Sequence, residues 1–177
     1  MTEGASLVTT ISGVPAATVT EGVVTDVSTS PSAINFGSFA PDTDVNAAHR
    51  VTVETNGTEG YQVFMFVRQD LLNGYGDTIA PIAGTNESPV AWLTGCDGSN
   101  PGCFGYHVGD DTLAGGSTRF AAPNTFAGAS TTPEEIMFSS VPTTADTEDL
   151  VFRINVSPAQ VAGVYNSELV YITVPVY

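Results

Sequence analysis

The stretch GVYNSELVYITVPVY, which runs from Gly163 to Tyr177, decides the fold class of this chain. Its segment LVYITV, residues 169–174, contains apolar, β-branched and aromatic residues, with no charge at either alternating position. Successive side chains of a β-strand point to opposite faces, so a segment uncharged on both faces suits a strand covered on both sides. We therefore expect a buried final strand that runs to the last residue and closes a β-sandwich.

The composition of the whole chain supports the same class. Its 177 residues include 18 Gly and 11 Pro, which favour tight turns, and many Val and Thr, which favour strands. Turn signals separate segments typical of about nine to eleven short strands. The sequence predicts an all-β fold, a β-sandwich or jelly roll, with an extended N-terminal arm at residues 1–16 and a single domain at residues 17–177.

The charge balance restricts the possible partners. Four Arg and no Lys stand against 19 Asp and Glu, which gives a formal net charge of −15 at pH 7. Nucleic acid is excluded as a partner, because phosphate binding requires clustered cations. Self-repulsion that keeps a secreted protein in solution explains the acidity, and carboxylates gathered around cations such as Ca²⁺ are the alternative. Without lysine, the amine donors of isopeptide crosslinks are also missing.

The cysteines and the hydropathy pattern indicate the compartment. No window of about twenty apolar residues occurs, so we expect no transmembrane segment. Residues 1–8 (MTEGASLV) lack the charged and apolar regions of a signal peptide. Cys96 and Cys103 flank the turn-rich loop DGSNPG and are predicted to form a disulfide, with free or metal-bound thiols as the alternative. We therefore expect an extracellular or cell-surface protein whose signal peptide has been removed.

Local sequence patterns predict strands and turns in the body of the chain. The sequence YQVFMFVRQ, residues 61–69, is apolar on both faces at its centre and predicts a central core strand. The turn NGTEG, residues 56–60, predicts a hairpin between this strand and the alternating segment HRVTVET, residues 49–55. The acidic segment TTADTED, residues 143–149, predicts a turn between two further strands.

No motif predicts catalysis. His49 and His107 are the only histidines, and no nucleophile elbow, zinc-binding helix or phosphate-binding glycine loop accompanies them. Asp110 and Asp111 follow His107 closely, but a surface histidine beside a turn is the expected arrangement. We therefore predict no active site and no enzymatic function.

A partial calcium motif lies in a polar loop. Asp42, Asp44 and Asn46 match the opening of an oxygen-ligand loop, which places alternate side chains around a hard cation. Ala47 replaces the glycine of that motif, and Val53 replaces its closing glutamate. No cofactor is therefore predicted, and Ca²⁺ remains an alternative.

Two further features concern glycans. Asn56 (NGT) and Asn86 (NES) are acceptor sequons in predicted loops, so both are possible glycosylation sites, with plain polar turns as the alternative. Trp92 and Tyr106 lie in short segments beside loops. If exposed, they would give an aromatic platform for glycans, and the chain would then be a secreted glycan- or Ca²⁺-binding module.

The segments AGVYNSELVYITVPVY, LVFRINVSPAQ and TVETNGTEGYQVFMFV together resemble secreted β-sandwich proteins of bacterial and archaeal cell surfaces, including TasA- and camelysin-like fibre subunits and pilin-type proteins. This resemblance implies a structural subunit of an extracellular filament. It also implies a homopolymer in which one subunit donates a strand to a groove in the next.

The N-terminal arm is the candidate donor strand. Residues 5–14 (ASLVTTISGV) are uncharged and compatible with a strand. Head-to-tail donation does not close on itself and so generates filaments. The alternative is an intramolecular first strand. The apolar side chains expected to fill a groove are those of Leu7, Val8, Ile11 and Val14.

Overall fold

The structure is a computed structural model that describes residues 4–110, 112–114 and 119–177. The described residues form thirteen strands and one four-residue helix, which confirms the all-β class. The elements are β1 (Leu7–Gly13), β2 (Val19–Thr20), β3 (Val23–Val24), β4 (Val45–Thr55), β5 (Tyr61–Val67), β6 (Leu71–Leu72), β7 (Thr78–Pro81), β8 (Val90–Ala91), α1 (Trp92–Gly95), β9 (Gly102–Val108), β10 (Thr125–Phe126), β11 (Glu134–Ser139), β12 (Thr143–Val156) and β13 (Leu169–Pro175).

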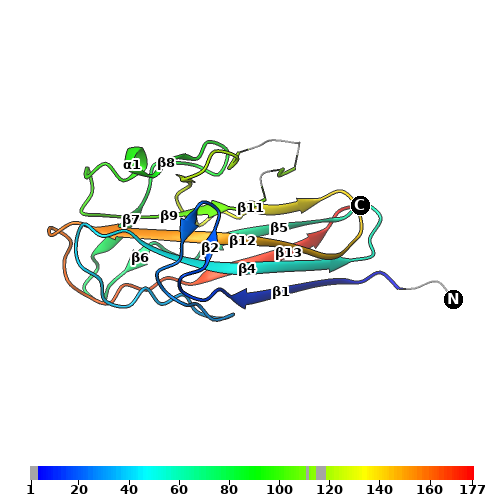
Figure 1. Ribbon diagram of the computed structural model, residues 1–177, viewed down its shortest axis with the longest axis horizontal. Helices are drawn as coiled ribbons and strands as arrows, with labels where there is room; N and C mark the ends of the chain where they lie inside the picture. Colours follow the sequence, from blue (N-terminus) through cyan, green and yellow to red (C-terminus); the bar gives the residue numbers. More distant parts are fainter. Residues whose placement is uncertain (1–3, 111, 115–118) are drawn as a thin grey trace.

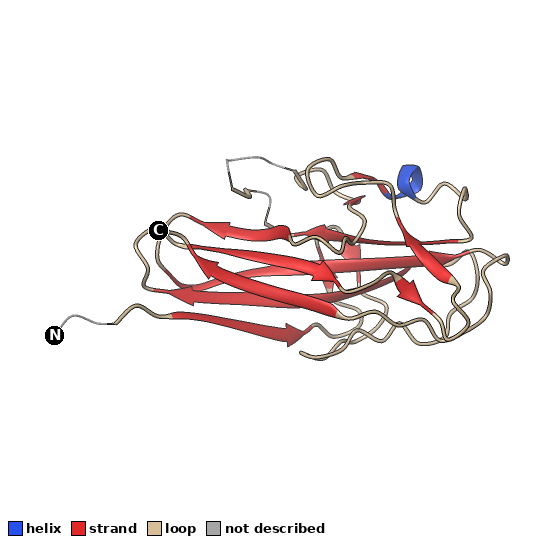
Figure 2. Ribbon diagram, turned by 180° about the vertical axis from the view of Figure 1, so that it is seen from behind, coloured by secondary structure: helices blue, strands red, loops and turns tan. Residues whose placement is uncertain are grey.

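Two larger sheets and two small ribbons contain these strands. One sheet has the order β1-β4-β12-β9-β7-β6, and the other has the order β11-β5-β13. The pairs β10-β8 and β2-β3 are separate two-stranded ribbons. The long strands run along the long axis of the molecule, and α1 with β8 lies above β9 in the view of Figure 1. The same arrangement is visible from behind in Figure 2.

The main hydrophobic core is built from strands of both larger sheets. Side chains alternate along each strand, so one face of each sheet supplies the apolar set. The buried members of this main core are Val51, Val53, Tyr61, Val63, Met65, Val67, Tyr106, Val108, Leu113, Phe120, Ala127, Ala129, Ile136, Met137, Leu150 and Phe152.

The predicted central strand is confirmed, but its predicted hairpin is wrong. β5 lies between β11 and β13, with Val63 and Met65 fully buried on its inner face. β4 belongs to the other sheet, where β1 and β12 occupy both of its edges. The connection at residues 56–60 therefore crosses from one sheet to the other. Gly60 is required in it, because a Cβ there would lie 1.9 Å from the Ser139 carbonyl oxygen and φ is +77°.

The final strand is an edge strand and none of its residues is fully buried, which corrects the expectation of a strand covered on both faces. β13 pairs with β5 and has no second neighbour among the described strands. It ends at Pro175, two residues before the end of the given sequence, and the Tyr177 side chain is fully exposed. Ile172, on the outer face, is 39% exposed, while Leu169 and Tyr171 pack against the main core. An uncharged strand is therefore compatible with an edge position as well as with a buried one.

The acidic segment 143–149 is part of β12 and not a turn, which is a second correction. The hydroxyl of Tyr61 donates a hydrogen bond to Asp146 Oδ2 at 2.7 Å, and Arg50 donates to both oxygens of Asp149. These donors lie on β5 and β4. Asp146 and Asp149 are thus stabilised by donors distant in the sequence, so the acidic segment continues the strand.

The predicted disulfide between Cys96 and Cys103 is confirmed. It joins the residue after α1 to β9, with the two Cα atoms 5.7 Å apart. Trp92 is the first residue of α1 and is buried in a second apolar cluster with Val14, Phe126 and their neighbours. The bridge therefore ties the α1 segment to the six-stranded sheet.

Candidate functional site

The N-terminal arm forms β1 at the edge of the six-stranded sheet. All seven residues of β1 pair with β4, from Leu7 opposite Thr55 to Gly13 opposite His49. β4 is its only neighbour among the described strands of the sheet, and β1 lies along the border of the molecule in Figure 1. Residues 1–3 of the predicted arm lie outside the described residues. Within this single chain the arm thus fills its own groove, as the intramolecular alternative expects.

Three of the four candidate side chains face into the groove. Leu7 and Ile11 are partly buried and pack against the main core, and Val14 is 2% exposed in the second cluster. Val8 is 52% exposed and points away from the core. Alternation along the strand explains the difference, because Val8 lies on the face opposite to Leu7 and Ile11.

The outer end of the arm is held by the residues that follow β4. The Ser6 amide donates to Asn56 Oδ1 at 2.8 Å, and Asn56 Nδ2 donates to the Gly4 carbonyl at 2.9 Å. Thr55 Oγ1 donates to the Ser6 carbonyl at 3.0 Å. Asn56 therefore continues the pairing of the arm beyond the strand with its side chain. It is exposed, as expected of a possible glycosylation site, but this role could not be predicted from the sequence.

The inner end of the arm is held by Thr29. The Val14 amide donates to Thr29 Oγ1 at 2.8 Å, and the Thr29 amide donates to the Val14 carbonyl at 3.0 Å. Gly13 permits this close approach, because a Cβ on it would lie 2.1 Å from the Thr29 carbonyl oxygen. No sequence motif distinguishes Thr29 from the other threonines.

A hydrogen bond links the arm to the three-stranded sheet across the border between the two larger sheets, which we call the seam. Thr9 Oγ1 donates to Thr173 Oγ1 at 2.7 Å, and Thr173 lies on the edge strand β13. The arm therefore contacts the six-stranded sheet through its backbone and the three-stranded sheet through a side chain. Its removal would open the core along this border.

The arm leads into a short, constrained connection. Ala17 has φ +61°, a left-handed conformation that costs a non-glycine residue of the order of 1 kcal/mol. Its amide donates to the Thr25 carbonyl at 2.7 Å, and Thr25 Oγ1 donates to the Pro15 carbonyl at 2.7 Å. Residues 15–18 therefore form a defined hinge candidate between the arm and the rest of the chain.

A group of carboxylates lies beside the end of β9. Glu148 Oε2 and Glu21 Oε1 would each lie 2.8 Å from a Cβ placed on Gly109, so both crowd this glycine. Burial raises the pKa of Glu148 to about 7, assisted by the negative charges of Asp110, Asp146, Glu21 and Asp149. The carboxylate of Glu148 is therefore unfavourable in the folded protein at neutral pH.

Replacing Glu148 by glutamine is expected to stabilise the fold in neutral and alkaline solution. The folded-state pKa of about 7 is above the ordinary value of 4.5, so the folded state binds more protons than the unfolded state between these values. Stability therefore falls as the pH rises through this interval. After allowance for solvent screening, we expect a gain of about 1–2 kcal/mol in the free energy of unfolding near pH 8 and none near pH 4.

Urea unfolding across this pH range checks the prediction. Glu54→Gln on the exposed face of β4 changes the net charge equally and is the matched control. Equal pH profiles for the Glu148→Gln and Glu54→Gln variants would contradict the assigned role of Glu148.

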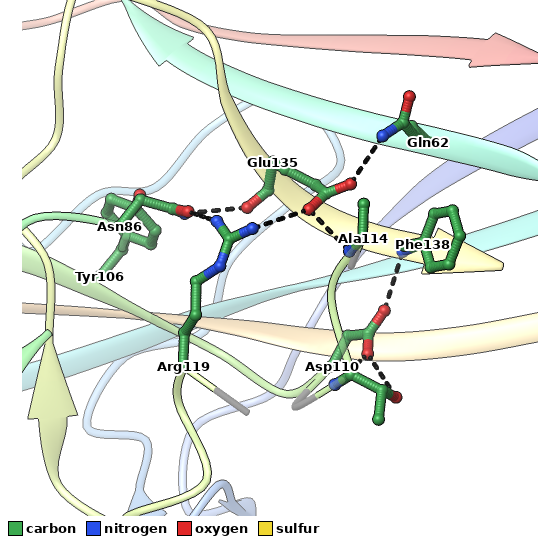
Figure 3. Close-up of polar contacts among 9 residues, drawn as sticks. Gln62, Asn86, Tyr106, Asp110, Ala114, Arg119, Glu135 and Phe138 are labelled. Atoms are coloured by element: carbon green, nitrogen blue, oxygen red, sulfur yellow. Dashed lines mark hydrogen bonds and ion pairs between the residues drawn. The ribbon is translucent and has the colours of Figure 1, made fainter. Parts of the chain in front are cut away.

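A buried polar network fastens the loop between β9 and β11. The Arg119 guanidinium lies between Asn86 Oδ1 and Glu135 Oε2, the latter at 3.3 Å, as Figure 3 shows. Glu135 also accepts hydrogen bonds from Gln62 Nε2 at 2.8 Å and from the Ala114 amide at 2.9 Å. This network is structural, because each described carboxylate oxygen in it has a donor.

Asn86 is a member of this network, which corrects its assignment as a possible glycosylation site. It is 2% exposed. Its Nδ2 donates to the Tyr106 hydroxyl at 3.0 Å and to the Glu135 carbonyl at 2.8 Å. A glycan on this nitrogen cannot be accommodated in the folded chain, because the atom is enclosed and both of its protons are bonded.

Two of the three calcium candidates already use a side-chain oxygen in hydrogen bonds to other side chains. Asp44 Oδ1 accepts hydrogen bonds from Trp92 Nε1 at 2.9 Å and Asn155 Nδ2 at 2.7 Å. Asn46 Oδ1 accepts a hydrogen bond from Arg153 Nε at 2.6 Å, so a cation already occupies its oxygen. Asp42 is exposed in a turn. Over residues 4–110, 112–114 and 119–177, no group of three or more His, Cys, Asp or Glu side chains is placed to hold a metal ion.

The histidines are buried, which corrects the expectation of a surface position for His107. His107 is 4% exposed, and its Nδ1 lies 2.7 Å from the Thr125 carbonyl. Burial lowers the pKa of His107 and of His49, so both are neutral near pH 7.

A hollow of about 220 Å³ lies beside His107 and is also lined by Glu21, whose Oε2 is 3.9 Å from His107 Nε2. Its described lining residues include no hydroxyl or thiol nucleophile, and Asp111 lies outside the described residues.

The proposed aromatic platform is not present on the surface. Trp92 is 1% exposed and Tyr106 is fully buried, so neither ring offers a face to a glycan.

No helix in the described part of the chain has the length and apolar character needed to cross a membrane. Comparison with protein-family models, curated proteins and solved structures gives no match to this chain. The arm and its groove are the candidate functional site of this chain.

Proposed function

We propose that this chain is the structural subunit of an extracellular homopolymeric filament, in which β1 of one sandwich-like subunit fills the groove beside β4 of the next. The observation that carries the proposal is the position of the arm. It is an edge strand joined to the sheet by a continuous ladder, and it also contributes Leu7, Ile11 and Val14 to the core. A strand of this kind provides backbone hydrogen bonds and apolar side chains together.

The contacts of the arm are transferable between chains. Every contact described for residues 4–14 is made with residues beyond the hinge candidate at 15–18. An identical arm from another copy would make the same set. Such an exchange is heterologous, so each subunit donates one arm and receives one, and the assembly grows as a filament without closing.

The free-energy difference between the monomer and the polymer arises outside the groove. The groove is filled in the monomer and in the polymer alike, and docking within one chain benefits from a high effective concentration. Exchange therefore requires a gain elsewhere. Extending the hinge would release the left-handed conformation of Ala17, and short strained hinges favour strand exchange. New contacts between adjacent subunits would supply the rest of the free energy that favours exchange.

Charge makes the assembly selective. A net charge of −15 opposes contact between arbitrary surfaces of two copies. Residues 5–14 carry no charge, so this repulsion is smallest along the segment that is exchanged. The intrachain disulfide fits an oxidising, extracellular setting.

A pair of cysteines across the seam tests the proposal. The hydroxyl oxygens of Thr9 and Thr173 are 2.7 Å apart, so sulfur atoms in their places lie within reach of a disulfide. In the Thr9→Cys, Thr173→Cys double variant, we expect oxidised monomers to carry an internal bridge. Oxidised filaments should give a ladder of covalent oligomers on a non-reducing denaturing gel.

Thr10→Cys with Thr173→Cys is the matched control. Thr10 lies on the exposed face of β1, opposite to Thr9, and should give no ladder. Filaments of the first variant that dissolve into monomer-sized bands only, or a chain that never polymerises, would contradict the proposal.

A further inference from the structure

Two Asn-Gly pairs, Asn56-Gly57 and Asn73-Gly74, occur in the sequence. In such pairs the backbone nitrogen of the glycine attacks Cγ of the asparagine. The new N–Cγ bond replaces the Cγ–Nδ2 bond, the glycine amide loses its proton, and ammonia leaves. Water then opens the succinimide to an aspartate or an isoaspartate, with no change in oxidation state. The reaction requires a side chain that is free to turn and a glycine amide that is accessible.

The docked arm holds Asn56 in a form that cannot react. Its Oδ1 accepts from the Ser6 amide at 2.8 Å and its Nδ2 donates to the Gly4 carbonyl at 2.9 Å. The Gly57 amide donates to Thr55 Oγ1 at 3.1 Å. Asn56 is exposed to water, and both described partners of its amide group belong to the arm. Withdrawal of the arm therefore frees the side chain.

Asn73 is held in a different way. Its Oδ1 accepts from the amides of Tyr75 and Asp77, each at 2.9 Å, and its Nδ2 donates to Asp77 Oδ2 at 2.9 Å. All three bonds lie within one turn, and the residue is 5% exposed. Asn73 is an internal reference, because its environment does not include the arm.

We propose that Asn56 is a deamidation site that is open only while the groove is empty, and that its conversion weakens the grip on any arm that arrives later. An aspartate or isoaspartate at position 56 has no proton to donate to the Gly4 carbonyl. It would instead place a negative oxygen against that carbonyl, which is unfavourable. The inference rests on the proposed function in one respect, because exchange requires the arm to leave the groove.

The extent of deamidation at Asn56 would therefore report how long the groove has been empty. A groove filled by the chain's own arm or by a neighbour's arm protects Asn56 equally. Subunits whose grooves stay empty would lose the Asn56 amide. Residue 56 would then contact an arriving arm more weakly, which would disfavour late incorporation of these subunits into the filament. The change is irreversible without a repair enzyme, so it acts in one direction only.

Peptide mass spectrometry of the full chain tests the inference. The Thr9→Cys, Thr173→Cys variant is incubated near pH 8 as a monomer, with its engineered bridge either oxidised or selectively reduced, and deamidation of Asn56 and Asn73 is followed with time. We expect oxidation to slow Asn56 conversion about fivefold or more, because local opening of the arm is suppressed, and to leave Asn73 unchanged. Equal rates at Asn56 in the two forms, or equal changes at both asparagines, would overturn the inference.

An Asn56→Asp variant gives a second, independent measurement. Hydrogen exchange at the amides of Ser6 and Leu7 should become about fivefold faster or more, while exchange in β5 stays unchanged. Unchanged protection of the arm would contradict the claim that conversion weakens its docking. Both measurements use monomers. A locked arm that protects Asn56 in a chain that forms no filaments would support this inference and refute the proposed function.

Discussion

Removal of residues 1–16 should abolish filaments and leave a less stable monomer or an aggregate. The deletion removes the fully buried Val14 and the partly buried Leu7 and Ile11, and it uncovers the edge of β4. Full burial of an apolar side chain of this size contributes about 1.5–3 kcal/mol, and Leu7 and Ile11 are only partly buried, so we expect a loss of about 3–5 kcal/mol in the free energy of unfolding. Electron microscopy near neutral pH and urea unfolding measure the two effects.

A synthetic peptide of residues 4–16 provides the matching rescue. Added to the truncated chain, it should restore stability without restoring filaments, because it fills the groove but links nothing. Val8→Ser is the control within the arm, since Val8 is half exposed, and it should leave both properties unchanged. Normal filaments from the truncated chain would refute strand donation.

Replacing Arg119 by methionine should destabilise the protein by about 3 kcal/mol. Its partner Glu135 is 7% exposed, and loss of the guanidinium leaves a buried carboxylate without its countercharge. Breaking one side of a buried pair commonly costs about 3–5 kcal/mol. The lower end applies here, because Gln62 and the Ala114 amide still donate to Glu135. Thermal and urea unfolding give the value.

Arg68→Met is the control for this prediction. The Arg68 to Glu168 pair has a similar separation, 2.9 Å, but both side chains are 63% exposed. Exposed pairs contribute about 0–1 kcal/mol, so the change should be small. Equal losses for the two arginine variants would show that burial of Glu135 does not set the energy.

The sequence predicts those features whose signal is local. The central strand β5 follows from a run that is apolar on both faces, and the disulfide follows from two cysteines around a turn-rich loop. In each case the residues themselves, rather than remote partners, determine the outcome.

Features that depend on remote partners could not be predicted. Asp146 and Asp149 are within β12 because Tyr61 and Arg50 compensate them from other strands. Asn86 is buried by partners 20 to 49 residues away in the sequence. The turn at residues 56–60 joins two sheets, because both edges of β4 are already occupied. Local composition contains no record of these neighbours.

The candidate site was predicted in its residues more than in its geometry. An uncharged arm and its apolar side chains were recognisable from the sequence, and Leu7, Ile11 and Val14 do face the groove. Thr29, which holds its inner end, has no distinguishing motif, and the NGT sequon does not predict that the Asn56 side chain holds its outer end. Hydrogen bonds of this kind arise only when distant segments are brought side by side.

The direction of the arm in its groove also determines how a filament would bear tension. The chain leaves the β1 ladder toward the hinge at Gly13, and Leu7 at the other end of β1 lies opposite Thr55, so a pull on the hinge acts along the strand axis. Ladder hydrogen bonds lie perpendicular to that axis, and all the register pairs of β1 would be loaded in shear at once. Peeling would load them one after another. A polymer joined in this way would resist stretching far better than lateral detachment of its subunits.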